Sequence, residues 1–274
     1  MLKNIIDKTK KTTPLVHAIT NYVTVNDCAN IILAAGGSPI MADDINEVED
    51  ITTICNTLAI NMGTLNKDTI EAMIVAGKHA NKLGHPVILD PVAVGASNWR
   101  NIGFAKLLDQ VKFSVIRGNV SEIKAVYYGS GNTSGVDVSE QDIITQKNLN
   151  QTIKLAKELS KKTGAVIAIS GEFDIVTDEN KAYVIKNGHE VMTKITGSGC
   201  MLTTVIATYC GANYDDVLGA TVASVCSMGI SGELAYDKMI KTDSGYSSFR
   251  MYLIDYMSKL EGEAVERGAK YEIQ

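Results

Sequence analysis

Short, almost continuously apolar segments alternate along this chain with longer segments of helical periodicity. Residues 86–90 (PVILD) and 165–170 (AVIAIS) lack the polar residue at every second position that a half-exposed strand would show. Such runs are typical of parallel strands that helices cover on both faces. The alternation therefore predicts an α/β fold with a single doubly wound, mostly parallel sheet and helices on both of its faces.

Further strands and helices follow from the same patterns. We expect additional strands at Leu58–Asn61, Ser114–Gly118, Ala182–Ile185 and His189–Lys194. We expect helices at Lys67–Leu83 and Asn150–Thr163, and an amphipathic helix over residues 250–274. The apolar segment 217–230 is short and interrupted by a glycine and two serines, so it predicts a buried helix rather than a membrane span.

Composition restricts the class of protein. The 274 residues are 45% hydrophobic and 21% charged, and no linker divides them, so we expect one domain over residues 1–274. A net charge of −5 without a basic stripe argues against nucleic acid as the main ligand. Five cysteines without a paired spacing, and an N-terminus without the apolar core of a signal peptide, predict a cytoplasmic protein that is not bound to a membrane.

Polar residues stand where several of the expected strands end. The carboxyl ends of parallel strands share one edge of a sheet, and ligands of such sheets bind beyond that edge. The segments are Asn61-Met62-Gly63, Asp90-Pro91, Arg117-Gly118-Asn119, Ser170-Gly171 and the turn 195–200. Each contains ordinary turn residues. Their convergence on one edge nevertheless favours a ligand site there.

The turn 195–200 reads ITGSGC and runs directly into an apolar segment with helical character, 201–209. Glycines let the backbone approach a ligand closely, and free N–H groups at a helix start attract anions. The segment lacks the lysine of a P-loop and the third glycine of a dinucleotide fingerprint, and the similar segment 129–134 fails the second pattern too. The turn therefore predicts an anion site of another kind, or a tight structural turn.

Cys200 lies at the start of this expected helix, where a thiol can act as a nucleophile or as a general base. The other four cysteines are expected to be small buried hydrophobes. A covalent cysteine mechanism normally needs a histidine base. None of the four histidines is tied to Cys200 by a motif, which favours a non-covalent role.

Carboxylates at two neighbouring strand ends suggest a metal. Asp90 and Glu122 could hold Mg²⁺ through waters, because Mg²⁺ commonly takes only one or two protein carboxylates. Glu122 also suits the first turn of a helix that Asn119 or Ser121 would cap. Arg117 at the same edge suits a phosphate or a structural ion pair. The mixed apolar and amide segments 18–26 and 39–44 could line a pocket for a small ligand.

Six blocks of sequence resemble the hydroxyethylthiazole kinase family of the ribokinase-like superfamily, and the resemblance covers nearly the whole chain. They are HAITNYVTVNDCAN (17–30), SPIMAD (38–43), LDPVAVGAS (89–97), IRGNVSEI (116–123), ISGEFDIVTD (169–178) and ITGSGCMLT (195–203). The resemblance implies a ribokinase-like fold without a separate lid domain. It also implies transfer of the γ-phosphoryl group of ATP, with Mg²⁺, to the hydroxyl of 4-methyl-5-(2-hydroxyethyl)thiazole in thiamine salvage. Members of the family are typically homotrimers with sites between subunits.

The resemblance also assigns roles to individual positions. Those expected to contact the acceptor substrate are Met41, Gly197 and Asn21. Those expected to contact ATP are Arg117, Ser170 and Gly199. Asp90 and Glu122 match the acids linked to Mg²⁺, and Cys200 is expected to accept the hydroxyl proton. The wider superfamily usually has Asp at this last position.

Four alternatives stay open at this point. Within the superfamily they are a pyrimidine-alcohol or other small-alcohol kinase and a nucleotide-dependent repair dehydratase; outside it, a silent nucleotide-binding regulator and a cysteine-dependent acyltransferase. The blocks at 17–30 and 38–43 argue against the first two. A silent regulator predicts a missing acid or a broken glycine turn, and an acyltransferase needs a histidine partner.

Overall fold

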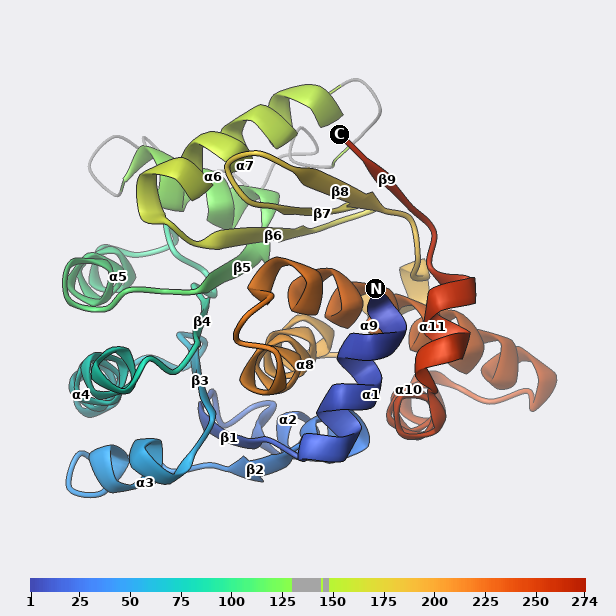
Figure 1. Ribbon diagram of the computed structural model, residues 1–274, viewed down its shortest axis with the longest axis horizontal. Coiled ribbons are helices and arrows are strands. Elements are labelled where there is room, and N and C mark those ends of the chain that lie inside the picture. Colours follow the sequence, from blue (N-terminus) through green and yellow to red (C-terminus); the bar gives the residue numbers. More distant parts are fainter. Residues whose placement is uncertain (130–143, 145–147) are drawn as a thin grey trace.

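The computed structural model describes residues 1–129, 144 and 148–274, and the strands in this part of the chain form one nine-stranded sheet (Figure 1). The strands are β1 (Leu15–Ile19), β2 (Ser38–Ile40), β3 (Thr57–Asn61), β4 (Val87–Asp90), β5 (Val115–Asn119), β6 (Val166–Ser170), β7 (Asp174–Thr177), β8 (Ala182–Ile185) and β9 (Tyr271–Ile273). Their order in the sheet is β2-β1-β3-β4-β5-β6-β7-β8-β9. Neighbours from β2 to β6 are parallel and those from β6 to β9 antiparallel, which confirms a mostly parallel sheet.

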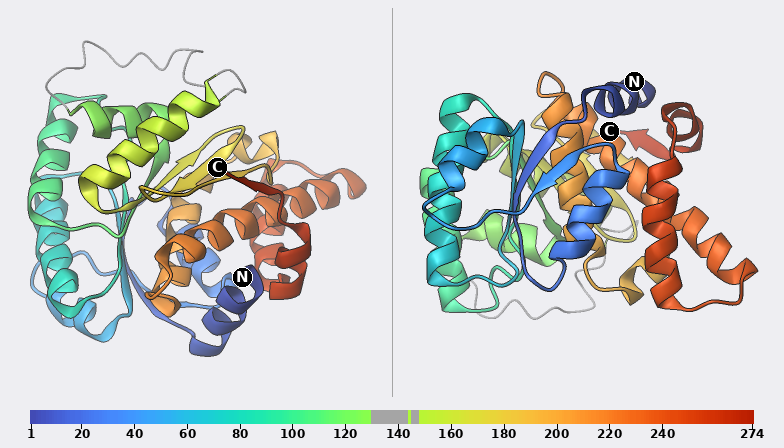
Figure 2. Two further views of the ribbon diagram at one scale, coloured as in Figure 1. Left: turned by 45° about the horizontal axis from the view of Figure 1, so that its top comes forward. Right: turned by 90° about the horizontal axis from the view of Figure 1, so that it is seen from below.

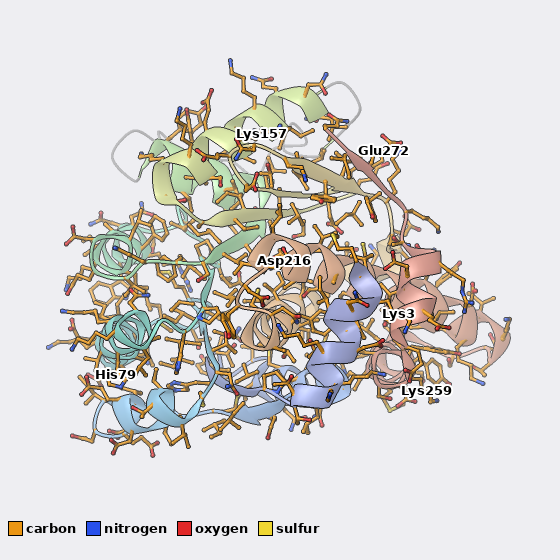
Figure 3. All side chains as sticks on the ribbon, viewed as in Figure 1. Lys3, His79, Lys157, Asp216, Lys259 and Glu272 are labelled. Carbon is orange, nitrogen blue, oxygen red and sulfur yellow. The ribbon has the colours of Figure 1, made fainter. Side chains whose placement is uncertain are left out.

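Helices cover both faces of this sheet, as the sequence predicts (Figures 1 and 2). One face carries α3 (Val48–Ile54), α4 (Lys67–Leu83), α5 (Asn98–Gln110), α6 (Val120–Tyr128) and α7 (Leu149–Thr163). The other face carries α1 (Leu2–Thr12), α2 (Val25–Ala34), α8 (Ser198–Ala212), α9 (Val217–Lys241), α10 (Tyr246–Lys259) and α11 (Gly262–Gly268). Lys3 of α1 and His79 of α4 accordingly lie on opposite sides of the sheet (Figure 3).

Helix α4 shows how the local sequence fixes an element. It begins after Asn66, whose side chain accepts from the backbone N–H groups of Asp68 and Thr69. In turn, the Thr69 hydroxyl accepts from the backbone N–H of Asn66. It ends at Gly84, which has φ 73° and so takes the left-handed conformation that glycine adopts without strain. The helix therefore has the bounds that the sequence predicts.

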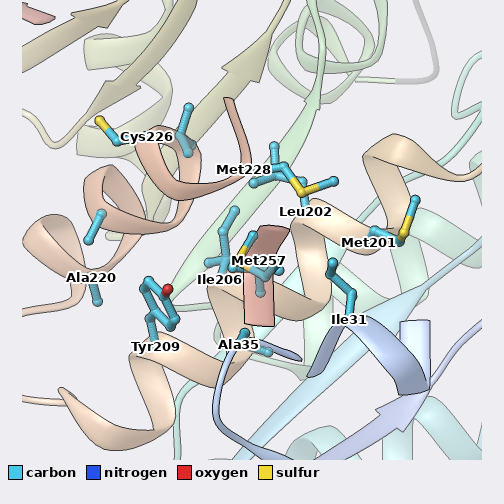
Figure 4. Close-up of a cluster of buried hydrophobic side chains, with 14 of the residues drawn as sticks. Ile31, Ala35, Met201, Leu202, Ile206, Tyr209, Ala220, Cys226, Met228 and Met257 are labelled. Atoms are coloured by element: carbon cyan, nitrogen blue, oxygen red, sulfur yellow. The ribbon is translucent and has the colours of Figure 1, made fainter. Parts of the chain in front are cut away.

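Helix α8 lies at the centre of the second face. It packs against β1, β3 and β4, and α9 packs beside it and extends over β6 to β8. Its apolar residues Met201, Leu202 and Ile206 are buried among side chains of α2 and α9 (Figure 4). This core fixes the first turn of α8 above the carboxyl ends of the parallel strands.

The apolar segment predicted as a buried helix is part of α9. By length and composition alone α9 could cross a membrane, but 78% of its most apolar window is buried inside the protein. Two of its buried polar residues, Thr221 and Ser224, donate to backbone carbonyls. It is therefore a core helix, as expected.

Two predicted elements are wrong. His189–Lys194 is not a strand: Glu190–Lys194 forms a 3₁₀ helix that His189 caps by accepting from the N–H of Val191. Residues 250–274 do not form one helix, because the chain ends α10 at Lys259, forms the short α11 and returns as β9 along β8. Of the glycine-containing segment 129–134, only Gly129 lies within the described residues.

Candidate active site

Four polar side chains lie on the α8 face of the sheet at its carboxyl edge. Side chains alternate between the faces of a strand, so a residue shares its face with the residue two positions earlier. The earlier residues belong to the core beneath α8: Ala59, Ile88, Val115 and Ala168. The strand-end residues that follow them in step are Asn61, Asp90, Arg117 and Ser170. Alternation thus directs all four toward the first turn of α8.

That first turn is an open helix end. Gly197 caps it with φ 84°, no side chain caps it, and no acidic residue lies in it. Met201 is the first residue whose N–H bonds back, to the Gly197 carbonyl at 2.8 Å, so the N–H groups of residues 198–200 have no partner within the helix. These groups and the helix dipole make an electropositive end suited to an anion.

Close approach explains both glycines of this turn. A Cβ atom at Gly197 would lie 2.5 Å from the Cγ2 atom of Thr24. One at Gly199 would lie 2.5 Å from Nη1 of Arg117. The backbone of the turn is therefore packed directly between α2 and the guanidinium group of β5.

Cys200 is half-buried in the first turn of α8, and its sulfur accepts two hydrogen bonds. The donors are Nδ2 of Asn21 and Nδ2 of Asn61, each 3.3 Å from Sγ. Within the described part of the chain, no histidine forms a hydrogen bond to this sulfur. The remaining cysteines (Cys28, Cys55, Cys210 and Cys226) are buried, as expected. The geometry thus disfavours a Cys–His pair and leaves the sulfur as an acceptor between two carboxamides.

Asp90 is fully buried behind Cys200. Its Oδ2 atom accepts from Asn61 Nδ2 at 2.8 Å and from Thr203 Oγ1 at 2.8 Å, and Nη1 of Arg117 lies 3.5 Å away. Its Oδ1 atom is buried without a protein partner. Burial raises the pKa of Asp90 to about 6, although the neighbouring guanidinium acts in the opposite direction.

Arg117 lies between Asp90 and Ser170, whose Oγ atom it contacts through Nη2 at 2.6 Å. It is only 8% exposed, and its Nε atom is buried without a partner. A buried guanidinium with an unused donor, next to the open end of α8, can bind an anionic ligand.

Glu122 takes part in the capping box at the start of α6, which agrees with its predicted place in the first turn of a capped helix. Its Oε2 atom accepts from the N–H of Asn119 and the Asn119 side chain accepts from the N–H of Glu122, both at 2.8 Å. Its Oε1 atom accepts from the N–H of Ala93 at 3.0 Å. The carboxylate is thus held close to Asp90, where its charge contributes to the raised pKa of that group.

These two acids are compatible with Mg²⁺ rather than with a metal bound by protein alone. Among the described residues, no three His, Cys, Asp or Glu side chains form a metal cage. The unpartnered Oδ1 atom of Asp90 can accept a hydrogen bond from a metal-bound water. Mg²⁺ keeps most of its waters and adds phosphate oxygens, so one or two carboxylates suffice.

A cleft of about 740 Å³ opens next to the end of α8. Its polar lining includes Arg117, Ser170, Ser198 and Gly199. Its apolar lining includes Met192, Leu202, Val225 and Met228. Cys200, Asn21 and Met41 do not line it. The cleft therefore brings together the three positions predicted to contact ATP and leaves the predicted acceptor positions outside.

Met41 follows β2 directly, beside β1 at the same edge of the sheet, and packs half-buried against the core beneath α8. The next residue, Ala42, is held by the buried His17, whose Nε2 lies 2.8 Å from the Ala42 carbonyl. Asn21 and Gly197 both contact Thr24. The structure thus places these acceptor candidates on the β1 side of the α8 end.

Asn61 is among the strand-end residues that the sequence places at this edge, but neither Asn61 nor Thr203 has a role predicted from the sequence. Asn61 stands directly opposite Asp90 in the parallel pairing of β3 and β4. Thr203 lies one helical turn after Cys200 and Gly199, on the face of α8 that meets the sheet. A polar residue at each neighbouring strand end, and a hydroxyl one turn beyond a candidate base, were the available clues.

Comparison with known proteins gives consistent matches. The model of the "Hydroxyethylthiazole kinase family" matches residues 6–263. A protein of Clostridium acetobutylicum named hydroxyethylthiazole kinase is 58% identical over 272 residues, which cover 99% of each chain. The solved structure of a hydroxyethylthiazole kinase protein from Pyrococcus horikoshii OT3 superimposes with a TM-score of 0.87 at 28% identity, covering 100% of this chain and 98% of that one. A ribokinase-like superfamily protein of Enterococcus faecalis V583 shares the fold, with a TM-score of 0.58 at 12% identity over 94% of each chain.

Proposed function

The chain belongs to the hydroxyethylthiazole kinase family, and we propose that it transfers the γ-phosphoryl group of ATP to the hydroxyl of 4-methyl-5-(2-hydroxyethyl)thiazole. One observation carries this proposal: the first turn of α8 is a helix end without a capping side chain, and it bears Cys200. The nucleotide-sized cleft borders the same turn. A phosphate at this turn would lie next to a sulfur that accepts hydrogen bonds.

The cleft is the proposed ATP site. Its apolar lining suits a base, and Arg117, Ser170 and the N–H of Gly199 suit phosphate oxygens. Phosphoryl transfer depends mainly on positioning and on charge stabilisation. The free N–H groups of residues 198–200, fixed in direction by the helix, would stabilise charge on the transferring group without reorganising.

The thiazole alcohol would bind on the β1 side of α8, where Asn21, Met41 and Gly197 lie. Its hydroxyl oxygen would attack the γ-phosphorus in line, the bond to the β,γ-bridging oxygen would break, and ADP would leave. Cys200, as a thiolate, would accept the hydroxyl proton late in this step and become a thiol. Asp90 and Glu122 would hold Mg²⁺ largely through waters, and the ion would offset charge on the ATP phosphates.

We also propose a cytoplasmic homotrimer with its sites between subunits. Tyr22 and Val23, next to Asn21, are 78% and 59% exposed. Large apolar side chains at the rim of a site are suitable for burial by a second copy of the chain. Light scattering at micromolar concentration would test this: a monomer would contradict it.

A direct assay tests the proposed function. Purified protein is mixed with Mg²⁺, ATP and the thiazole alcohol, and ADP and the phosphate ester are measured. We expect both products in equal amounts. The matched control is 5-ethyl-4-methylthiazole, which lacks the hydroxyl and should give no ADP above background. A pyrimidine alcohol and pyridoxine in parallel reactions distinguish other small-alcohol kinases. Absence of ADP with every alcohol would contradict the kinase proposal.

A further inference from the structure

We infer that Asn61 is a positioning residue, which fixes Cys200 relative to Asp90 so that the sulfur can accept the proton of the acceptor hydroxyl. This inference rests on the proposed kinase function. Asn61 ends β3 and is only 4% exposed. It lies at the switch point of the sheet, where β2 and β3 flank β1 on opposite sides.

The carboxamide of Asn61 has all of its principal hydrogen-bonding positions filled. Its Nδ2 donates to Asp90 Oδ2 at 2.8 Å and to Cys200 Sγ at 3.3 Å. Its Oδ1 accepts from Asn21 Nδ2 at 3.0 Å and from the N–H of Gly63 at 2.9 Å. A carboxamide has two N–H donors and one carbonyl oxygen. Only one of its two orientations satisfies this set, so the direction of its N–H groups is fixed.

The direction of these N–H groups determines what the sulfur can do. Asn21 donates to the same sulfur at 3.3 Å, so two carboxamides hold the Cys200 side chain by N–H···S contacts. Both donors come from the sheet side, from the ends of β1 and β3. Cys200 itself is only half-buried, which leaves part of its surface open to a hydroxyl. Rates of positioned reactions fall about 10²-fold for a displacement of about 1 Å, so this support can decide kcat.

A purely structural role makes a different prediction. If Asn61 acts only as a donor to the buried acid Asp90, the effect of its removal does not depend on Cys200. A double-mutant cycle separates the two roles, because residues that act as a unit are non-additive.

The test compares Asn61→Ala in three backgrounds: wild type, Cys200→Ala and Cys200→Asp. We expect Asn61→Ala to lower kcat about 30-fold in the wild type and about 5-fold or less beside Cys200→Ala. Beside Cys200→Asp the loss should be at least as large as in the wild type, since the N–H donors also bind an anionic carboxylate. KM for ATP should stay within about 3-fold throughout. An equal loss in all three backgrounds would overturn the inference.

Asn213 supplies the matched control. It is also 4% exposed, and its Nδ2 donates to the Tyr209 carbonyl and the Thr9 hydroxyl at the opposite end of α8. Asn213→Ala should destabilise the protein but change kcat by the same factor in every Cys200 background. If Asn61→Ala does not fold, Asn61→Ser, which keeps a hydroxyl for Asp90, should give the same order of losses.

A second measurement does not depend on activity. The wild type, Asn61→Ala, Cys200→Ala and the double variant are unfolded in urea without ATP or acceptor. The effect of Asn61→Ala on the unfolding equilibrium constant should differ by about 2-fold or more between the wild type and the Cys200→Ala background. The Asn213–Cys200 cycle should be additive. If unfolding shows the Asn61–Cys200 coupling but the wild type has no kinase activity, only the proposed kinase function is contradicted. Additive unfolding for Asn61 and Cys200 would overturn the contact itself.

Discussion

Helices α6 and α8 both begin at the carboxyl edge of the parallel strands, but their first turns differ. Asn119 and Glu122 close the end of α6 with a reciprocal capping box. The end of α8 has only Gly197, with no capping side chain and no acidic residue. A missing cap typically costs about 1 kcal/mol of stability. The protein thus leaves open the helix end that carries Cys200 and closes the one that carries a carboxylate.

Because of this difference, the first turns of α6 and α8 suit different ligands although their sequences look similar. Each combines glycine, a small polar residue and the start of a helix. At α6 the N–H groups of Asn119 and Glu122 are already used by side chains, and an anion meets the Glu122 carboxylate there. At α8 they remain available, and Arg117 lies against Gly199. We therefore expect phosphate at α8 and the metal-linked acid at α6.

The largest effect is expected at Cys200, the side chain on the open end. Cys200→Ala should lower kcat by about 10²–10⁴-fold if proton transfer is its only role. Cys200→Asp should keep or raise kcat, because a carboxylate is ionised throughout the working pH range. Steady-state kinetics with the thiazole alcohol measure both. Loss of all activity in Cys200→Asp, together with a phosphorylated or acylated cysteine in the wild type, would show a nucleophile instead.

A methyl group on the open turn should have the next largest effect. Gly199→Ala would displace the buried Arg117 from Ser170 and Asp90, so kcat/KM for ATP should fall about 10²-fold. Gly211→Ala, on the last turn of α8, is the control, because its methyl would meet Thr57 instead. That variant should lose stability and keep its KM for ATP. Similar kinetics for the two variants would argue against a phosphate at the first turn.

Asp90 lies behind both helix ends and should destabilise the free protein at neutral pH. Its folded-state pKa of about 6 lies above the ordinary 3.8, so stability is lost as pH rises from about 4 through about 6. Asp90→Asn cannot acquire the charge. It should be more stable than wild type by about 2 kcal/mol at pH 7.5 and show little gain at pH 4. Urea unfolding without metal or nucleotide measures this, and a gain that is equal at both pH values would contradict the assignment.

The smallest effect is expected at the closed end. Glu122→Gln keeps a capping-box side chain and removes the charge, so stability should change by less than about 1 kcal/mol. If the acid is linked to the metal, the Mg²⁺ concentration for half-maximal rate should rise about tenfold. A magnesium titration of the kinase rate measures this. An unchanged Mg²⁺ requirement would leave Glu122 as a cap alone.

The parts of the fold that sequence predicts best are those with strong local rules. Lys67–Leu83 has a capping box at one end and a left-handed glycine at the other, and both can be read from the sequence. His189–Lys194 fails because its β-branched residues imitate a strand, while His189 provides the cap of a 3₁₀ helix. The antiparallel β9 depends on pairing with the distant β8, which no local pattern encodes.

The site divides in the same way. Asp90, Arg117 and Ser170 could be proposed because each polar residue ends an apolar strand. Asn61 has the same position, but its importance comes from reaching Cys200, 139 residues away in the chain. The unpartnered Nε of Arg117 and Oδ1 of Asp90 also appear only when the elements are packed together. Sequence therefore locates the edge of the sheet, and tertiary packing selects the residues that act there.

The central claim is that the open first turn of α8 binds phosphate. The most direct test is to place a negative charge in this turn and to measure the affinity for nucleotide. Ser198→Asp places an acid in the first turn of α8, where it should stabilise the helix and repel phosphate. Calorimetry with ATP and with adenosine, using Ser198→Asn as the neutral control, measures the effect. We predict that Ser198→Asp alone weakens ATP binding about tenfold or more and leaves adenosine binding unchanged. Equal ATP affinity in Ser198→Asp and Ser198→Asn would contradict phosphate binding at this turn.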